Sequence, residues 1–211
     1  MTSEDDDVFP ELIVFDCDMC LWSPEMYELG SSLPTTSVQG NLGDKGRGTR
    51  GAANTEGDVV ELFDGALAVL QDFALGKFGK KCRIAAASSA DNAMAVRCAH
   101  ECMRRLEVLP GKNMSVVFSN GFPEGFHGNL QIGREGKLSS NKTTHFRELQ
   151  KETGIKFENM LFFDDCNWGD NCKIVGKLGV TTMRTPRGLT RDEFQEGLVA
   201  YRRKKRRREA S

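Results

Sequence analysis

The sequence lacks the features that define several whole classes of protein. None of its apolar stretches approaches the roughly 20 residues that a membrane-spanning helix needs. Its N-terminus carries the acidic residues Glu4 to Asp7 instead of the basic and then apolar layout of a secretory signal. No internal repeat is present. We therefore expect an intracellular protein in the cytoplasm, with the nucleus as the alternative location.

A disulfide framework is not indicated either. The 7 cysteines are odd in number and scattered along the chain, which fits reduced thiols in a reducing compartment. Structural zinc is the alternative. Cys17 and Cys20 have a ligand-like spacing, but Cys166 and Cys172 lie too far apart for a tight zinc knuckle.

The chain has the size of one domain and an uneven distribution of charge. Its 211 residues, 39% of them hydrophobic, suffice for a single core. The net charge of −1 combines seven consecutive basic residues, Arg202 to Arg208, with a remainder of charge −8. We expect disorder at 1–10 and 202–211 and one domain at 11–201. The basic segment is a candidate targeting element or docking site for an anionic partner, and a role in solubility alone is the alternative.

Apolar runs of strand length alternate with helix-like segments, which predicts an α/β fold with a doubly wound parallel sheet. The expected strands are 11–16, 84–88, 115–119, 160–163 and 180–183. The expected helices are 64–75, 91–106, 141–153 and 171–178, and a last helix opens with a capping box of Thr190 and Glu193.

One segment does not fit this alternation. Residues 30–58 are rich in Gly, Ser, Thr and Asn and show almost no apolar periodicity. Because they follow the first strand, we expect a small cap or loop insertion at about 23–60. An unstructured expansion without a role is the alternative.

Two aspartates, Asp16 and Asp18, follow the first apolar run. Alternating side chains of a strand would send both to the same side, at the strand end where open α/β sheets bind ligands. Two such carboxylates need a cation or a shared proton between them, and Mg²⁺ prefers oxygen ligands. Taken alone, the motif is equally compatible with a solvated turn.

Three further segments offer matching groups. The run at 84–87 ends in Ser88 and Ser89, and the run at 160–163 ends in an acidic pair, Asp164 and Asp165. Lys142 lies near the start of a predicted helix. A nucleophile, an acid/base, phosphate ligands and a metal cage are the requirements of phosphoryl transfer. Each group alone has an ordinary explanation, such as a solvated lysine or a serine that ends a strand.

With these residues in view, the chain resembles the haloacid dehalogenase superfamily and, more narrowly, the eukaryotic magnesium-dependent phosphatase family. The resemblance covers the first strand and about residues 60–200. Its motifs are Asp-Cys-Asp-Met-Cys-Leu-Trp at 16–22, Ala-Ala-Ala-Ser at 85–88, Asn-Lys-Thr-Thr-His-Phe-Arg-Glu-Leu-Gln at 141–150, Met-Leu-Phe-Phe-Asp-Asp at 160–165 and Lys-Leu-Gly-Val-Thr at 177–181. It implies the Rossmann-like core of that superfamily.

The resemblance implies a role for each motif residue. Asp16 would be the nucleophile that forms an aspartyl-phosphate. Asp18 would protonate the leaving oxygen and later activate water. Ser88, Ser89 and Lys142 would bind the phosphoryl oxygens.

The resemblance also implies a Mg²⁺ site. Its ligands would be the Asp16 carboxylate, the Asp18 backbone carbonyl and one carboxylate of the acidic pair. We expect Asp165 as the direct ligand, supported by Asp164.

The implied function is a Mg²⁺-dependent phosphomonoesterase acting on phosphotyrosine-like substrates, as a protein tyrosine phosphatase would, or on sugar phosphates. One alternative is a phosphatase for protein or nucleic-acid phosphates. Another is a non-catalytic module that binds phosphorylated or anionic partners.

Three departures from the family pattern affect the expectations. Cys20 stands where most of the superfamily has Thr or Val. The loop after Asp165 is about two residues longer than usual, so the supporting Asn is expected to be Asn171, with Asp170 as a competitor. The segment after Trp22 is unlike the usual cap, and caps set substrate choice in this superfamily. Trp22 and Trp168 are expected either to pack at the rim of the site or to contact substrate.

Overall fold

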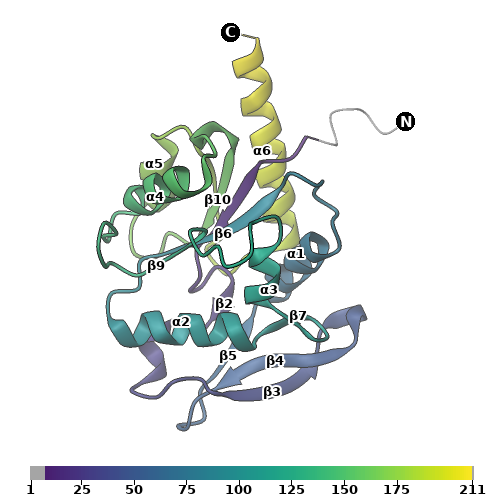
Figure 1. Ribbon diagram of the computed structural model, residues 1–211, viewed down its shortest axis with the longest axis vertical. Helices are drawn as coiled ribbons and strands as arrows, with labels where there is room; N and C mark the ends of the chain where they lie inside the picture. Colours follow the sequence, from purple (N-terminus) through teal and green to yellow (C-terminus); the bar gives the residue numbers. More distant parts are fainter. Residues whose placement is uncertain (1–7, 211) are drawn as a thin grey trace.

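A parallel sheet forms the centre of the computed structural model, which describes residues 8–210 (Figure 1). Its five strands have the order β11-β10-β1-β6-β9. The strands are β1 (Leu12–Phe15), β6 (Arg83–Ser88), β9 (Leu130–Ile132), β10 (Met160–Asp164) and β11 (Thr181–Arg184). All four neighbouring pairs run parallel, so the predicted α/β class is confirmed.

Helices cover both faces of this sheet. Leu12 and Val14 pack with Phe146 of α4 (Thr143–Thr153) and with α5 (Asn171–Gly176). Ile13 and Phe15 point the other way, and they pack with α1 (Asp64–Ala74) and α6 (Arg191–Glu209). Because β1 is central and buried on both faces, the residues that follow it emerge in the middle of the sheet edge.

The insertion after β1 is a second sheet. It is antiparallel, with the order β2-β5-β4-β3. Its strands are β2 (Trp22–Ser23), β3 (Thr36–Asn41), β4 (Arg47–Ala53) and β5 (Val59–Leu62), and the 3₁₀ turns η2 (Met26–Leu29) and η3 (Gly43–Lys45) lie between them. The alternative of an unstructured expansion is therefore wrong. These strands were not predicted from the sequence because their glycines lower the strand propensity of the segment. At Gly51, a Cβ atom would lie 2.7 Å from a methyl group of Val59 on the paired strand.

The insertion packs on α2 (Ala93–Arg105), which lies between the two sheets (Figure 1). Hydrogen bonds to buried or partly buried side chains help to attach it to the core. The Glu107 carboxylate accepts the backbone N–H of Thr49 at 2.9 Å. Gln71, buried on α1, donates to the Leu42 carbonyl at 2.8 Å. The insertion is thus anchored beside the parallel sheet.

One expected strand is wrong. Residues 115–119 lie in helix α3 (Met114–Ser119), which follows the short hairpin β7 (Glu107–Leu109) and β8 (Lys112–Asn113). The Asn113 side chain caps this helix by accepting the N–H of Val116 at 3.0 Å. A short apolar run fits a strand or a buried helical turn equally well, and here the cap decides for the helix. The fifth strand of the sheet is instead β9.

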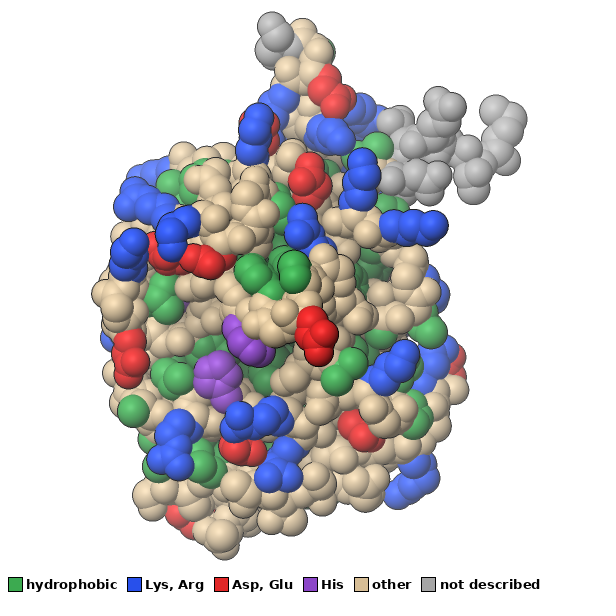
Figure 2. Space-filling view, in the orientation of Figure 1, with side chains coloured by type: hydrophobic (Ala, Val, Ile, Leu, Met, Phe, Trp, Pro, Cys, Tyr) green, Lys and Arg blue, Asp and Glu red, His purple; other side chains and the backbone are tan. Residues whose placement is uncertain are grey.

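The described parts of both chain ends are folded, where disorder was expected. Residues 1–7 and 211 lie outside the described residues, but Phe9 packs on Phe78 with ring centroids 5.6 Å apart. The predicted capping box of Thr190 and Glu193 is present, and α6 continues through the basic run to Glu209. Figure 2 shows Lys and Arg side chains gathered around the projecting end of this helix.

Part of the basic run is docked on the domain. Lys204 donates to the carbonyls of Gly179 and Val180 at 2.9 and 2.8 Å, and Arg208 also donates to Gly179. These carbonyls lie just before β11, so the two side chains tie α6 to the edge of the parallel sheet. This bonding explains why the segment is helical despite its like charges.

The 3₁₀ turn η4 (Phe157–Asn159) leads into β10. Within residues 8–210, no helix is both long and apolar enough to cross a membrane.

Candidate active site

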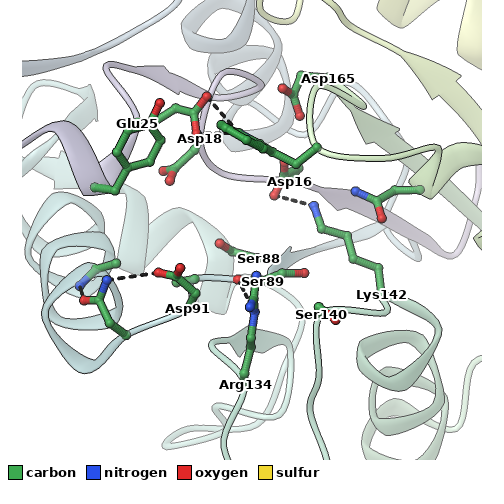
Figure 3. Close-up of a pocket in the computed structure, with 16 residues that line it drawn as sticks. Asp16, Asp18, Glu25, Ser88, Ser89, Asp91, Arg134, Ser140, Lys142 and Asp165 are labelled. Atoms are coloured by element: carbon green, nitrogen blue, oxygen red, sulfur yellow. Dashed lines mark hydrogen bonds and ion pairs between the residues drawn. The ribbon is translucent and has the colours of Figure 1, made fainter.

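A pocket of about 590 Å³ opens at the carboxyl ends of β1, β6 and β10 (Figure 3). Asp16 follows β1, Ser88 ends β6 and Asp165 follows β10, and all three line the pocket. Asp18 and Lys142 line it as well. The fold therefore brings the sequence motifs together at one place, because parallel strands end at the same edge.

Lys142 is the charged centre of the site. It precedes α4, its side chain is buried, and its Nζ lies 2.6 Å from Asp16 Oδ1 and 2.6 Å from Asp164 Oδ2. Burial by itself lowers the pKa of Lys142, but the charges of Asp16 and Asp164 outweigh it and raise the pKa above its ordinary value. Lys142 is therefore a permanent cation beneath the pocket, and the alternative of a solvated helix lysine is wrong.

Both carboxylate oxygens of Asp164 accept hydrogen bonds from the protein. Besides Lys142, it accepts the N–H of Cys166 at 2.8 Å, and Asn171 Nδ2 lies 3.2 Å from both its oxygens. Asp170 instead pairs with Arg184 at 2.8 Å. Asn171 is thus the residue that reaches the acidic pair. Asp165, unlike Asp164, faces the pocket.

Three carboxylates converge beside Lys142. Oxygens of Asp16, Asp164 and Asp165 all lie within 4.8 Å of one another. Burial raises the pKa of Asp16 well above its ordinary value, and the charges of Asp164 and Asp165 act in the same direction. Burial and the Asp164 charge likewise raise the pKa of Asp165. One lysine does not balance three carboxylates, so this oxygen-rich set fits a hard divalent cation.

Asp18 lies apart from this cluster. A tight turn follows it directly, with Met19 in the left-handed region at a φ of 54°. Its Oδ1 accepts Trp22 Nε1 at 2.8 Å and its Oδ2 accepts the Met26 N–H at 3.1 Å. Burial raises the pKa of Asp18, against these two hydrogen bonds. The two aspartates thus share one pocket but have different partners, a positive one for Asp16 and neutral ones for Asp18.

The loop after β6 presents two serines. Both line the pocket, and the Ser89 Oγ is buried without a hydrogen-bond partner among residues 8–210. The buried His145 supports this loop: its Nε2 lies 3.1 Å from the Ser88 carbonyl and 3.0 Å from that of Gly133. Carbonyls only accept, so this nitrogen carries the proton and His145 has a packing role. The free Ser89 hydroxyl fits an anionic oxygen in the pocket.

Sequence reasoning missed part of the rim. Glu25, Tyr27 and Arg134 line the pocket together with Trp168. The Trp168 Nε1 donates to Glu25 at 2.8 Å, across 143 residues of sequence. No local motif could have linked these positions. Of the insertion, only the segment around η2 reaches the pocket, so the expected cap position holds for Glu25 and Tyr27 but not for β3, β4 or β5.

The cysteines do not form a metal site. All seven are free thiols, and within the described part of the chain the acidic trio is the one group with three metal-ligand side chains close together. Cys20 is buried, and its thiol lies 3.6 Å from the Phe163 carbonyl. The zinc alternative therefore has no structural support, and the Cys20 thiol links the turn after β1 to the Phe163 carbonyl of β10.

Fold and site together define an α/β protein with a cluster of three carboxylates and a buried lysine at the carboxyl edge of its parallel sheet. The chain belongs to the Acid Phosphatase family, whose profile matches residues 8–204. This membership confirms the haloacid dehalogenase resemblance inferred from the motifs.

Further similarities include one characterised protein and one solved structure. A stretch of 61 residues is 41% identical to human Magnesium-dependent phosphatase 1 and spans 29% of this chain. It covers 34% of that relative, so the match extends over about a third of the relative's length. The crystal structure of CbbY from Rhodobacter sphaeroides in complex with phosphate superposes with a TM-score of 0.48 and 15% identity, covering 87% of this chain and 89% of CbbY.

Proposed function

We propose that this protein is a Mg²⁺-dependent phosphomonoesterase that works through an aspartyl-phosphate on Asp16. One observation carries the proposal: the Asp16 carboxylate lies in the pocket, ion-paired with buried Lys142 at 2.6 Å and next to two further carboxylates. Such a carboxylate is available as a nucleophile, while the charges around it suit a phosphoryl group. Membership of the Acid Phosphatase family supports the same reaction.

In the first step, an Asp16 oxygen forms a bond to phosphorus while the bond from phosphorus to the leaving oxygen breaks. The charge of Lys142 lowers the pKa of Asp16 against the effect of burial and so favours its ionised form, and it offers positive charge to the phosphoryl oxygens. The unpartnered Ser89 hydroxyl, with Ser88 beside it, supplies hydrogen bonds to those oxygens.

Asp18 suits the proton transfers. Its raised pKa lets it hold a proton that passes to the leaving oxygen. The resulting Asp18 carboxylate then takes a proton from water, which attacks phosphorus and releases phosphate and Asp16. The Trp22 and Met26 hydrogen bonds hold this carboxyl in place, separate from the cation-binding carboxylates.

The residues that would hold Mg²⁺ are Asp16, Asp165 and the backbone carbonyl of Asp18. Asp164 supports the site through Lys142 and Asn171, since both its oxygens already accept protein hydrogen bonds. When bound, the cation supplies the positive charge that offsets the carboxylates and the phosphoryl group.

The test is an assay of phosphate release from phosphotyrosine and sugar phosphates, with Mg²⁺ or with EDTA. We expect Mg²⁺-dependent turnover that falls at least about 10³-fold in Asp16→Asn. Asp170→Asn is the control, because Asp170 is a surface acid of the same loop region paired with Arg184. Activity of Asp16→Asn within tenfold of wild type would overturn the mechanism. Binding of phosphate esters without any turnover would favour a non-catalytic binding module.

A further inference from the structure

A second groove, of about 800 Å³, runs along one lateral edge of the parallel sheet. Strand β11 is the last strand at that edge. Thr181 and Thr182 of β11 lie in the groove, Gly176 of α5 bounds it on one side, and α6 forms its other wall. None of its lining residues lines the candidate active site, so the groove is a separate feature of the surface.

The β11 edge offers backbone groups to a further strand. The Thr185 N–H donates to the Asp164 carbonyl at 2.9 Å, so Thr185 faces β10. Successive residues of a strand direct their N–H and C=O groups to alternate edges, and Thr182 and Arg184 therefore direct theirs away from β10. Within residues 8–210, no strand pairs with this edge. It can thus accept an extended chain in the way that sheet edges bind peptides.

The other free edges of the two larger sheets are less suited to strand addition. β2 and β9 have only two and three residues, and β3 shifts its register against β4 between Val38 and Gln39. Short strands and an irregular register are features that protect natural sheet edges from pairing. β11 keeps one regular register with β10 along its four residues. Of these edges, β11 is the one most open to pairing.

The wall that α6 presents to the groove is basic at one end. Arg203 is exposed and has no hydrogen-bond or ion-pair partner among residues 8–210. Lys204 and the exposed Arg207 line the same end, which Lys204 joins to the start of β11 through its hydrogen bonds. Glu196 is the acidic residue of this wall, and it precedes Arg203 by two helical turns, about 10 Å. The groove therefore carries more positive than negative charge.

Charge and shape together select the occupant of this groove. An acidic strand beside β11 would bring carboxylates to Arg203. Between Glu196 and Arg203, Val199 is 57% exposed and lines the groove with Ala200, so the same strand would find an apolar surface there. A second copy of this chain, paired edge to edge through β11, would bring two basic walls together, which is unfavourable. The favoured occupant is therefore an acidic segment of another protein.

We propose that the β11 groove binds an acidic, extended peptide segment of a partner protein, which pairs with β11 as a further strand of the sheet and places its carboxylates against Arg203. The proposal is independent of the phosphatase reaction, because the groove and the candidate active site share no lining residue. It assigns the basic run of α6 a protein partner instead of a nucleic acid or a membrane.

The probe is a fluorescein-labelled octapeptide of alternating Glu and Val, and its binding to the full-length protein is measured by fluorescence anisotropy. An octapeptide of alternating Glu and Pro has the same charge, but it cannot join a sheet because proline lacks the backbone N–H. We expect the Glu–Val peptide to bind more tightly than the Glu–Pro peptide, and added salt to weaken its binding. The Glu–Val peptide should also slow amide hydrogen exchange at Thr182 and Arg184, and the Glu–Pro peptide should not.

A pair of charge reversals tests the basic wall. Arg203→Glu should weaken binding of the Glu–Val peptide about 3- to 10-fold, because it replaces attraction by repulsion at the groove. Arg97→Glu is the matched control, since Arg97 is an exposed helical arginine outside the groove. It makes the same change in net charge and should leave the affinity unchanged.

Several outcomes would overturn the proposal. They are equal binding of the Glu–Val and Glu–Pro peptides, equal affinities in Arg203→Glu and Arg97→Glu, and no binding of the Glu–Val peptide at about 1 mM. Tighter binding of a single-stranded DNA octamer, with the same dependence on Arg203, would assign the groove to nucleic acid instead. A dimer that slows exchange at Thr182 without any peptide would assign the edge to a second copy.

Discussion

The two sheets contribute to the pocket in opposite ways. The parallel sheet presents Asp16, Ser88 and the acidic pair, all buried, at one edge, where Lys142 pairs with Asp16 and Asp164. The antiparallel sheet lies on α2 and reaches the pocket only through the exposed rim at Glu25 and Tyr27. The buried polar groups of the pocket therefore come from the parallel sheet and its flanking segments, and the antiparallel insertion adds only part of the exposed rim. Changes at the parallel edge should therefore alter rate and stability strongly, and changes in the antiparallel sheet weakly.

The largest expected effect concerns Asp18, which follows strand β1 of the parallel sheet and accepts hydrogen bonds from Trp22 and Met26 of the insertion. Asp18→Asn should lower kcat for alkyl phosphates by about 10²–10⁴-fold, because general acid–base catalysis is worth that much. The loss should be smaller for p-nitrophenyl phosphate, whose leaving group needs little protonation. Steady-state kinetics on both substrates measure the difference. Equal losses on the two would argue against Asp18 as the acid.

The next effect is on stability and tests the parallel edge. Lys142→Met should reduce the free energy of unfolding by about 3–5 kcal/mol, because it leaves the buried carboxylates of Asp16 and Asp164 without their cation. Lys151→Met is the matched control, since Lys151 forms exposed pairs on the same helix, and it should reduce the free energy of unfolding far less than Lys142→Met does. Urea unfolding provides the measurement. Similar losses in the two variants would contradict the special position of Lys142.

The third prediction uses the raised pKa values of Asp16 and Asp165. An acid whose pKa is higher in the folded state stabilises the fold at low pH, and this stability is lost as pH rises through the folded pKa. A cation needs the ionised carboxylates and relieves their repulsion. Mg²⁺ should therefore raise Tm more at pH 8 than at pH 5. At pH 8, a hundredfold excess of Mg²⁺ over Kd should add about 2.7 kcal/mol to the free energy of unfolding.

The variant for this prediction is Asp165→Asn, which should abolish the Mg²⁺-dependent Tm shift, while Asp170→Asn should retain it. A shift that is independent of pH, or that survives in Asp165→Asn, would mean that the cation binds elsewhere.

The smallest expected effect lies in the antiparallel sheet. Arg50 on β4 pairs with Asp64 at 2.7 Å, but the Asp64 side chain is 98% exposed. Asp64→Asn should change stability by less than about 1 kcal/mol and leave kcat within about twofold of wild type. A large loss of kcat would mean that the position of the antiparallel sheet affects the reaction rate. It would contradict the expectation that changes in this sheet have weak effects.

The predictable part of the fold consists of its most regular segments. The strands β1, β6 and β10 follow from apolar runs that end in Asp or Ser, and α4 and α6 follow from their apolar spacing and capping residues. Several strands escaped prediction because their signals are local and weak. β9 has only three residues, Leu130 to Ile132, amid turn residues. In β3 and β4, glycines that allow close packing removed the alternation by which strands are detected.

The sequence by itself determined which chemical groups meet at the edge of the sheet, because a strand end is a local feature and parallel strands end together. It therefore pointed to Asp16, Asp18, Ser88, Lys142 and the acidic pair. Only the tertiary structure decided their partners. It gave Lys142 both Asp16 and Asp164, turned Asp18 toward Trp22 and Met26, and joined Glu25 to Trp168. Such pairings depend on how distant elements pack, and packing across 143 residues leaves no periodic trace in the chain.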